Sequence, residues 1–317
     1  MAVFTQVSQA DLAAFWQGFD LPEVRELIGI SEGTENSNYK IITAERPYIL
    51  TLFEKRTDPK ELPFFAGLMQ HLATSGVSCP LPIANKQGEL LGELCGRPAV
   101  ITSFLEGSSL RAWQPAQCHS LGAALAQMHN AAASFAGSRP NRLSVAGWQD
   151  LFKGCEKADD VARGLHSLLA TELDYLAQHW PQDLPRGVIH ADLFPDNVFF
   201  KDGAVSGLID FYFACTDAFA YDLAICLNAW CFEDHVAFNI TKAQQLLRGY
   251  VSVRALSGAE RAALPLLCRG AAIRFLLTRL YDWLHPKGNK PRDPRDYLKR
   301  LQFHQQVHTI SEYGLAA

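Results

Sequence analysis

The alternation of hydrophobic and polar residues divides the chain into a strand-rich first third and a helix-rich remainder. Short apolar runs bounded by turn residues predict strands over 26–31, 39–43 and 47–53. Apolar residues at helical spacing predict a helix from about 59 to 74, and the glycine-punctuated stretch 79–107 supplies two more strands. We therefore expect a small antiparallel sheet with one helix in this part of the chain.

Beyond residue 107 the pattern becomes helical. Apolar faces with a period near 3.6 predict five helices, over 115–133, 166–180, 221–232, 241–253 and 266–284. Only the segment 186–213 interrupts them with strands. The change predicts an α+β chain of two lobes with a cleft between them: a small, β-rich N-lobe over 1–105 and a larger, mostly helical C-lobe over 106–317.

Composition narrows the class of protein. The chain has 317 residues, of which 48% are hydrophobic and 20% charged, as is usual for soluble globular proteins. A net charge of -4 without basic runs argues against a nucleic-acid partner. Charged residues interrupt the apolar stretch 266–284, so we expect no membrane span. A start without signal-peptide character and eight cysteines without CxxC pairs predict a cytoplasmic location.

Polar residues of chemical interest lie in "RGVIHADLFPDNVFF", residues 186–200. His190, Asp192, Asp196 and Asn197 stand between two apolar runs that read as buried strands. Burying a carboxylate between such strands costs free energy unless a hydrogen-bond partner, a cation or a metal ion pairs with it. This arrangement indicates a bound metal or ligand.

A further acid reaches the same place if the next segment is a hairpin. Asp202-Gly203 is a strong signal for a two-residue turn. Such a turn places Asn197 opposite Leu208 and puts Asp210 two residues further along on the same face, about 7–8 Å away diagonally. Carboxylate and amide oxygens without a nearby thiolate favour Mg²⁺ as the shared ligand.

The loop before the hairpin supplies the candidate base. Asp192 is free to face whatever the metal holds, and a carboxylate there can accept a proton from an attacking hydroxyl. We expect His190 to hold the loop through a backbone hydrogen bond instead of acting as a base.

These motifs resemble those of a known superfamily. "HADLFPDN" followed by "IDF" is similar to the catalytic loop and metal site of the protein kinase-like fold. Ala191, Pro195 and the later "YDLA" resemble the aminoglycoside phosphotransferase and choline kinase-like branch. Three longer strings, "SEGTENSNYKI", "YILTLFEKR" and "GLIDFYFACTDAFAYDLAICLNAWCFE", resemble the type II homoserine kinases, and the likeness covers nearly the whole chain.

The resemblance implies an activity and a set of roles. The expected reaction is ATP-dependent phosphorylation of the side-chain hydroxyl of L-homoserine to O-phospho-L-homoserine, a step toward threonine. Asp192 would be the catalytic base, and Asn197 and Asp210 would hold Mg²⁺ on the ATP phosphates. The partner would be a small molecule, and the chain a monomer or weak homodimer.

The resemblance also implies where the nucleotide binds. The loop 32–38 would cover the phosphates, although an ordinary hairpin turn is an equally good interpretation of the segment taken alone. The segment 100–107 would connect the lobes and offer backbone groups to adenine. The nucleotide-binding candidates are Gly33, Thr34, Asn36, Ser37, Asn38, Ser103 and Leu105.

Two positions depart from the general kinase pattern. Thr51 stands where the third strand should carry a cation for the phosphates, and Phe65 stands where the following helix should offer a glutamate to that cation. Both halves of the ion pair are missing together, which avoids leaving one buried charge alone. Lys40, Lys55 or Arg56 would then supply the positive charge.

Homoserine needs an acid for its ammonium group and a cation for its carboxylate. The acid candidates are Asp217, Asp222, Glu233 and Asp234, and the cation candidates are Arg274 and Arg279. Both arginines lie within an apolar helix, so pairing with Asp222 or Asp282 is an equally good interpretation. We expect Asp222 to brace the catalytic loop.

Three alternatives remain open at this point. The chain could phosphorylate another hydroxylated acceptor, such as choline, a methylthiosugar or an aminoglycoside. It could be a non-catalytic nucleotide-binding regulator, as Thr51 and Phe65 suggest. It could also be a metal-dependent hydrolase that uses His190, Asp192 and Asp210, which the oxygen-rich ligand set disfavours.

Overall fold

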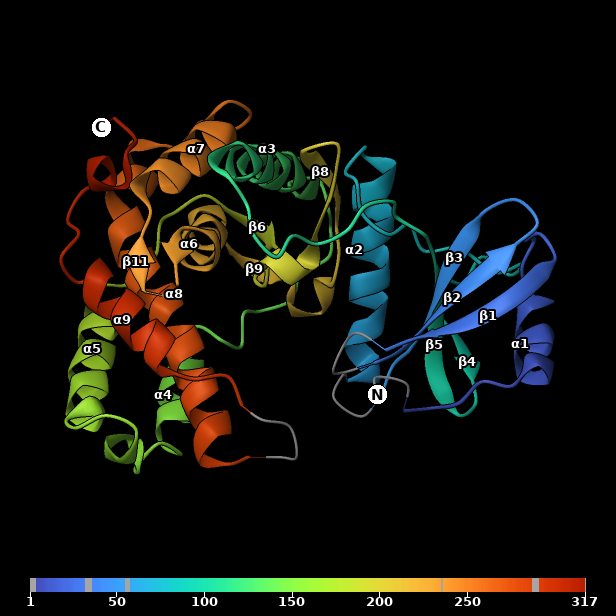
Figure 1. The fold of residues 1–317 in the computed structure, drawn as a ribbon, viewed down its shortest axis with the longest axis horizontal. Helices are drawn as coiled ribbons and strands as arrows, with labels where there is room; N and C mark the ends of the chain where they lie inside the picture. The colour runs from blue at the N-terminus through green and yellow to red at the C-terminus, as the bar shows by residue number, and fades with distance from the viewer. Residues whose placement is uncertain (1–3, 32–35, 55–57, 235, 287–290, 317) are drawn as a thin grey trace.

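The computed structural model describes residues 4–31, 36–54, 58–234, 236–286 and 291–316. Figure 1 shows a small sheet at one end of the molecule and a larger group of helices at the other, with one helix between them. The predicted division into a β-rich and a helical part is therefore confirmed as a fold class. Within the described residues, no helix is both long and apolar enough to cross a membrane.

The first part is a five-stranded antiparallel sheet in the order β1-β2-β3-β5-β4. Its strands are β1 (Val24–Ile30), β2 (Ser37–Thr43), β3 (Pro47–Leu52), β4 (Gly92–Leu94) and β5 (Arg97–Ser103). All five strands expected from the sequence are present.

The two faces of this sheet have different neighbours. One face packs against the short helix α1 (Gln9–Trp16), and this core includes Tyr39 of β2 and Tyr48 of β3. Because side chains alternate along a strand, Asn38 and Thr51 project from the opposite face. That opposite face is the one that meets the rest of the chain.

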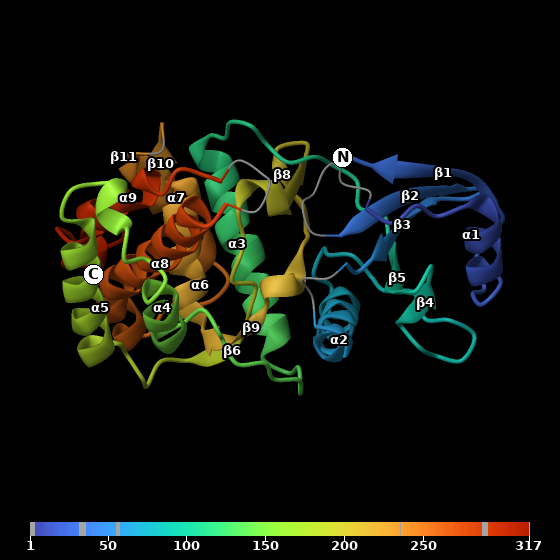
Figure 2. The ribbon, with the colours of Figure 1, turned by 90° about the horizontal axis from the view of Figure 1, so that it is seen from below.

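Helix α2 (Leu62–Thr74) joins the two parts of the molecule. Its Leu68 and Leu72 belong to the core of the helical part, whereas its Phe65 packs with Phe53 and Val100 of the sheet. Figures 1 and 2 show this helix between the sheet and the C-terminal helices. The relative position of the two parts therefore depends on how α2 is held.

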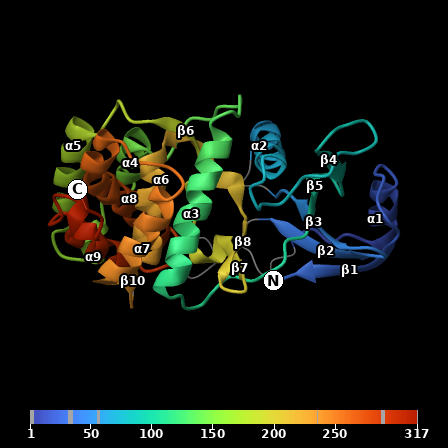
Figure 3. The same cartoon turned by 90° about the horizontal axis from the view of Figure 1, so that it is seen from above.

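The five helices predicted for the second part are present. They are α3 (Pro115–Ala132), α5 (Leu165–His179), α6 (Phe219–Trp230), α7 (Ile240–Val251) and α8 (Gly258–Leu284). Every residue of α6 is buried, which explains its almost continuously apolar sequence. Figure 3 shows α3 between α7 and α2. The sequence pattern did not predict α4 (Val145–Phe152) or α9 (Arg295–His304).

Short strands support the loops between these helices. A hairpin is formed by β7 (Val198–Lys201) and β8 (Ala204–Leu208), while β6 (Arg186–Ile189) pairs with β9 (Cys215–Ala218). A third pair consists of β10 (Phe232–Glu233) and β11 (Ala237–Phe238). Strand β9 lies just beyond the segment 186–213 to which we had limited the strands.

Glycines allow α3 and α7 to approach each other closely. A Cβ atom built on Gly122 would lie 2.0 Å from the carbonyl oxygen of Leu246, and one on Gly249 would lie 2.0 Å from that of His119. Backbone atoms cannot move aside as a flexible side chain can. These two positions therefore require glycine for the helices to meet.

We expect Gly122→Ala to lower the free energy of unfolding by about 1–3 kcal/mol, because the added methyl group forces the two helices apart. Urea unfolding followed by circular dichroism measures the change. Gly258→Ala is the matched control, since a Cβ there has no neighbour within 4 Å. Equal stability of Gly122→Ala and the unmodified chain would contradict the close-packing argument.

Candidate active site

The turn that carries Asp192 has an unusual backbone conformation held from both sides. Ala191 has a φ of 64°, in the left-handed region that side chains disfavour. The Asp222 carboxylate accepts the backbone N–H groups of His190 at 2.7 Å and Ala191 at 2.9 Å. The guanidinium of Arg274 donates to the Ala191 carbonyl. The direction of the chain at Asp192 is thus fixed by side chains from α6 and α8.

Asp222 is buried as a charged group. Burial alone raises its pKa, but the hydrogen bonds from the His129 ring and from the backbone N–H of His190 lower the pKa below its usual value. His129 Nε2 lies 3.0 Å from the carboxylate, and its Nδ1 lies 2.8 Å from the Tyr250 hydroxyl. The expectation that Asp222 braces the loop that carries Asp192 is confirmed.

His190 supports the loop in the way predicted for it. Its Nε2 lies 2.9 Å from the carbonyl oxygen of Ile209, and the backbone N–H of Asp192 donates to its Nδ1 at 3.3 Å. Burial lowers the pKa of His190, so the ring is neutral with its proton on Nε2. It therefore ties the loop to the residue that precedes Asp210.

Asn197 contacts Asp192 directly. Its Nδ2 donates to the backbone carbonyl of Asp192 at 2.8 Å and to the carboxylate at 3.3 Å. The backbone carbonyl of Asn197 accepts the backbone N–H of Ile209 at 3.0 Å. Asp210 follows Ile209 in the chain, so the structure brings the loop, Asn197 and the backbone leading into Asp210 together.

The route by which these residues meet differs from the one we expected. The turn at Asp202-Gly203 is present, with φ values of 53° and 82°. A bulge then shifts the register, so that Val198, not Asn197, pairs with Leu208. The predicted register was wrong, because one extra residue moves the side chains beyond it to the other face.

Ser206 supplies the physical reason for this bulge. Its hydroxyl donates to the Glu106 carbonyl at 2.7 Å, and its own carbonyl accepts a hydrogen bond from the Ser78 hydroxyl. Asp210 itself has a φ of 65°, which redirects the chain after β8. The local backbone, not simple strand alternation, decides where the Asp210 carboxylate points.

The donor set suits a magnesium ion that is completed by substrate phosphates. Both partners of Asn197 Nδ2 are acceptors on Asp192, which fixes the orientation of the amide. The Asp210 side chain is exposed. In the described part of the chain, no three His, Cys, Asp or Glu side chains gather as a metal site made only of protein would require. One amide and one carboxylate fit Mg²⁺, which usually keeps waters and phosphate oxygens as ligands.

The candidates for the phosphate loop have separate surroundings. Ser37 is fully buried and its hydroxyl accepts the N–H groups of Phe4 and Thr5, at 2.8 and 3.0 Å. Asn38 Oδ1 accepts the Thr51 hydroxyl at 2.7 Å, and Asn36 Oδ1 accepts the N–H of Glu54 at 3.3 Å. Gly33 and Thr34 lie outside the described residues.

The connection between the two parts begins at the end of β5. The Ser103 N–H donates to the Leu81 carbonyl, and its hydroxyl accepts the Leu81 N–H, both at 2.9 Å. The backbone N–H and carbonyl of Leu105 have no hydrogen-bond partner among the described residues. Next to it, the Lys40 ammonium lies 4.2 Å from the centre of the Phe104 ring.

The acceptor candidates lie in different places. Arg274 is 2% exposed and is part of the clamp on Ala191. Arg279 lies 3.4 Å from the Asp293 carbonyl and 3.5 Å from the Asp296 carboxylate, and burial lowers its pKa. The alternative that either arginine pairs with Asp222 or Asp282 is not seen among the described residues, where Arg274 binds the Ala191 carbonyl and Arg279 contacts Asp293 and Asp296.

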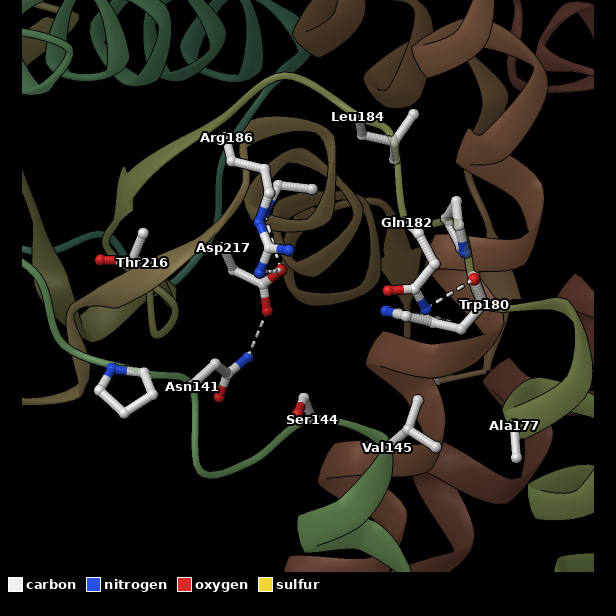
Figure 4. A pocket seen from close by; sticks show the side chains of 13 residues that line it. Asn141, Ser144, Val145, Ala177, Trp180, Gln182, Leu184, Arg186, Thr216 and Asp217 are labelled. Carbon is white, nitrogen blue, oxygen red and sulfur yellow. Dashed lines mark hydrogen bonds and ion pairs between the residues drawn. The ribbon is translucent and has the colours of Figure 1, made fainter.

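Asp217 lies at the end of β6–β9 remote from His190, beside a cavity of about 350 Å³. Figure 4 shows the Asn141 amide and the Arg186 guanidinium pointing toward its carboxylate. The amide donates at 2.8 Å, and the guanidinium lies 3.6 Å away. The residues that line this cavity do not include Asp192, Asn197 or Asp210.

Sequence reasoning missed two supports of the site. The buried His129 in α3 orients Asp222, and the only sign of it was a polar residue on an apolar helix. The Trp230 indole donates to the Leu193 carbonyl at 2.8 Å, holding the loop just beyond Asp192. Neither contact follows from spacing, because each joins segments far apart in the sequence.

Comparison with known proteins identifies the family. Residues 26–256 match the model of the phosphotransferase enzyme family. The chain is 56% identical to a homoserine kinase of Xanthobacter autotrophicus and 57% identical to one of Parvibaculum lavamentivorans, in each case over all of both chains. The chain belongs to this phosphotransferase family and, within it, to the homoserine kinases. The family expected from the sequence motifs is therefore confirmed.

Solved structures support the fold of this phosphotransferase. An amicoumacin kinase in complex with AMP-PNP, Ca²⁺ and Ami aligns over 94% of this chain and 92% of its own, with a TM-score of 0.68 and 15% identity. A spectinomycin phosphotransferase with ADP and spectinomycin aligns over 99% and 98%, with a TM-score of 0.66 and 15% identity. At this identity the likeness shows the fold alone.

We expect the stability of this kinase to fall as the pH drops below about 6.5, partly because of His129. Burial lowers the pKa of His129 below 6.5, so the folded state keeps the ring neutral while the unfolded state takes up a proton. This group contributes a slope of up to about 1.4 kcal/mol per pH unit. Urea unfolding between pH 8 and pH 5 measures the slope, and His129→Gln should flatten it.

His119→Gln is the matched control, because His119 is an exposed histidine of the same helix. It should leave the slope as it is. A slope that is the same in His129→Gln as in the unmodified chain would show that His129 is not held neutral by the fold.

Proposed function

We propose that this protein transfers the γ-phosphoryl group of ATP to the side-chain hydroxyl of L-homoserine, giving O-phospho-L-homoserine. The observation that carries the proposal is the contact of Asp192 with Asn197 beside the backbone that leads into Asp210. Homoserine is named as the acceptor because relatives that match over the whole chain are homoserine kinases.

Asp192 acts as the base in this proposal. Its loop is clamped at Ala191, and the amide of Asn197 donates to its carboxylate, which keeps one oxygen oriented while the other faces the acceptor. As the hydroxyl oxygen attacks the γ-phosphorus, the carboxylate accepts its proton, and ADP leaves on the opposite side. Positioning of the hydroxyl in line with the leaving oxygen supplies much of the rate.

Asn197 and Asp210 would hold Mg²⁺ through one amide and one carboxylate oxygen. The ion, when bound, neutralises charge on the ATP phosphates. Asn197 would bind the metal through Oδ1 while its Nδ2 donates to the Asp192 carboxylate. Asp210 follows Ile209, whose carbonyl oxygen lies within hydrogen-bond distance of His190.

We place the nucleotide between the sheet and the catalytic loop. Leu105 would pair with adenine through its backbone, and the loop containing Gly33, Thr34, Asn36 and Asn38 would cover the phosphates. Ser37 and Ser103 would act indirectly, because their hydroxyls already bind the protein backbone.

Of the acceptor candidates, we favour Arg279 as the partner of the homoserine carboxylate. Both of its polar contacts are long, and its guanidinium lies 4.5 Å from the centre of the Tyr297 ring. Arg274 would act indirectly by holding Ala191, and Asp217 would brace β6 against β9.

Other properties follow from the same proposal. The lobes would divide between residues 105 and 106, in the connection that follows β5. All eight cysteines are free and seven of them are buried, which suits a reducing cytoplasm. The enzyme would act as a monomer or weak homodimer and bind no nucleic acid.

ADP release in a coupled assay should require both ATP and L-homoserine, and choline, a methylthiosugar or an aminoglycoside should not replace the amino acid.

Asp192→Asn should lower kcat by about 100- to 10,000-fold while ATP binding is retained, because only the proton acceptor is lost. Calorimetric titration with ATP checks the binding.

Asp196→Asn is the control, since Asp196 is an acid of the same loop whose side chain is 73% exposed. It should keep near-normal turnover. ADP release with another acceptor but not with homoserine would overturn the acceptor, and a fully active Asp192→Asn would overturn the assignment of the base.

A further inference from the structure

A cavity of about 350 Å³ lies beside the β6–β9 pair, and the proposed reaction does not use it. Its walls come from the segment that leads into α4, from the end of α5 and the residues after it, and from β6 and β9. The volume is within the range of small-molecule sites, which is about 300–1,000 Å³. The charges and apolar side chains of these walls indicate what kind of molecule fits.

One wall of the cavity carries an acid and a cation side by side. The Asp217 side chain is only 8% exposed, and the Arg186 guanidinium lies 3.6 Å from its Oδ1. Asn141 donates to Oδ2 at 2.8 Å, and Figure 4 shows both neighbours pointing toward the carboxylate. An ammonium group fits this acid, and a carboxylate fits this cation.

Both charged groups have capacity for a ligand. A carboxylate accepts up to about four hydrogen bonds. Among the described residues, Asp217 accepts two, from the Asn141 amide and from the Ala218 N–H at 2.7 Å. Its contact with Arg186 is longer than a hydrogen bond, and the Arg186 side chain is 52% exposed. The guanidinium therefore keeps donors for a second anion.

The opposite wall of the cavity is mainly apolar. Figure 4 shows Val145, Trp180 and Leu184 across the cavity from the charged wall. The Trp180 ring is held by the Trp148 ring, which lies 5.1 Å away edge to face. The Gln182 amide on this wall already donates to the Trp180 carbonyl, at 3.2 Å. A hydrocarbon chain gains free energy when it is buried against such a surface.

The charged wall is built on strands that lead to the loop carrying Asp192. Arg186 is the first residue of β6, whose last residue, Ile189, precedes His190 of that loop. Asp217 lies in β9, which is followed by α6 with the carboxylate that holds the loop. A ligand that bridges Arg186 and Asp217 therefore acts on both strands of the pair next to the loop.

The Asn141 side of the cavity is connected to α2. Arg139, two residues earlier, accepts the Thr216 N–H at 2.6 Å through its carbonyl. Its guanidinium donates to the Ala214 carbonyl at 3.1 Å and pairs with Glu61, the N-cap of α2, at 2.8 Å. Because α2 lies between the two parts of the molecule, a shift of this segment changes how they meet.

We propose that this cavity is an effector site for a free α-amino acid with an aliphatic side chain. Its ammonium group binds Asp217, its carboxylate binds Arg186, and its hydrocarbon chain lies on the apolar wall. A zwitterion is favoured over a simple amine or acid because the two charges of the wall balance each other. Homoserine is a poor ligand here, since its hydroxyl would meet the apolar wall. The effect on turnover rests on the proposed kinase function, whereas the binding does not.

Titration calorimetry without ATP or homoserine tests the site with L-valine, L-leucine and L-isoleucine. At least one of them should bind with a Kd of about 1 mM or lower. The amine and the acid that each lack one charge of that amino acid should bind at least about tenfold more weakly, because each loses a charge-assisted contact.

Two variants remove the charges of the site one at a time. Asp217→Asn and Arg186→Gln should each raise the Kd for the amino acid about tenfold or more. Arg163→Gln is the matched control and should bind normally, since Arg163 is an exposed arginine of the same part of the molecule that does not line the cavity. If Asp217→Asn does not fold, Arg186→Gln still tests the site, because about half of that side chain is exposed.

The effect on the reaction is measured in the ADP-release assay. At saturating homoserine and ATP, the bound amino acid should change kcat at least about twofold, and Arg186→Gln should abolish the change. If the proposed function is wrong, the unmodified chain would bind the amino acid in the calorimeter but release no ADP with homoserine, so the two failures are distinguishable.

Several results would overturn the inference. An effect that excess homoserine removes would place the amino acid in the acceptor site instead. Tighter binding of the simple amine in Arg186→Gln would show a site for cations alone. Absence of binding by all three amino acids, normal affinity in either variant, or binding without a change in kcat would also contradict an effector site.

Discussion

The peptide around Ala191 is the constraint on which the site depends. A left-handed backbone at a residue with a side chain costs on the order of 1–3 kcal/mol and persists only when its surroundings enforce it. Here Asp222 accepts the Ala191 N–H, and Arg274 donates to the Ala191 carbonyl. Hydrogen bonds to charged groups are worth about 1.5–3 kcal/mol each, which is enough to offset the strain.

The burial of charge follows from this constraint. Asp222 is inaccessible to solvent, and it remains ionised because His129 and two backbone N–H groups donate to it. Those donors come from α3 and the loop that carries Asp192, so the packing of α3 and α6 determines where the loop lies. Gly122 and Gly249, which let α3 approach α7, therefore support the site indirectly by fixing the position of α3.

The connection between the two parts of the molecule follows a different principle. Near Asp210 the contacts are aromatic, and the rings of Phe53 and Phe65 lie edge to face against Tyr212. The ion pairs that fix α2 lie instead at its N-cap, between Glu61 and the guanidinium groups of Arg139 and Arg142. The position of α2 relative to the sheet therefore does not need the lysine–glutamate ion pair of the general kinase pattern. The ATP phosphates still require positive charge from elsewhere.

The sequence was informative where the physics is local. Periodicity located the five strands of the sheet and six helices, and Asp202-Gly203 located a turn. It failed where distant segments decide the outcome: the bulge at Ser206 exists because the connection after β5 and Ser78 bind it. Strand β9 is only four residues long and needs β6 as its partner.

The candidate site divides in the same way. A motif was enough to predict that His190 and Asp222 brace the loop. The part played by His129 was not predictable, because its partners are 93 and 121 residues away along the chain. The contacts of Tyr212 with Phe53 and Phe65 likewise depend on how the sheet, α2 and the segment after Asp210 meet.

The central claim is that the clamped loop directs Asp192 toward the acceptor while Asn197 and Asp210 share a metal ion. A crystal structure with Mg²⁺, a non-hydrolysable ATP analogue and homoserine tests it most directly. The account predicts Asn197 Oδ1 and an Asp210 oxygen on the ion, with Asp192 hydrogen-bonded to the homoserine hydroxyl. An ion bound elsewhere, with the two side chains pointing apart, would contradict it.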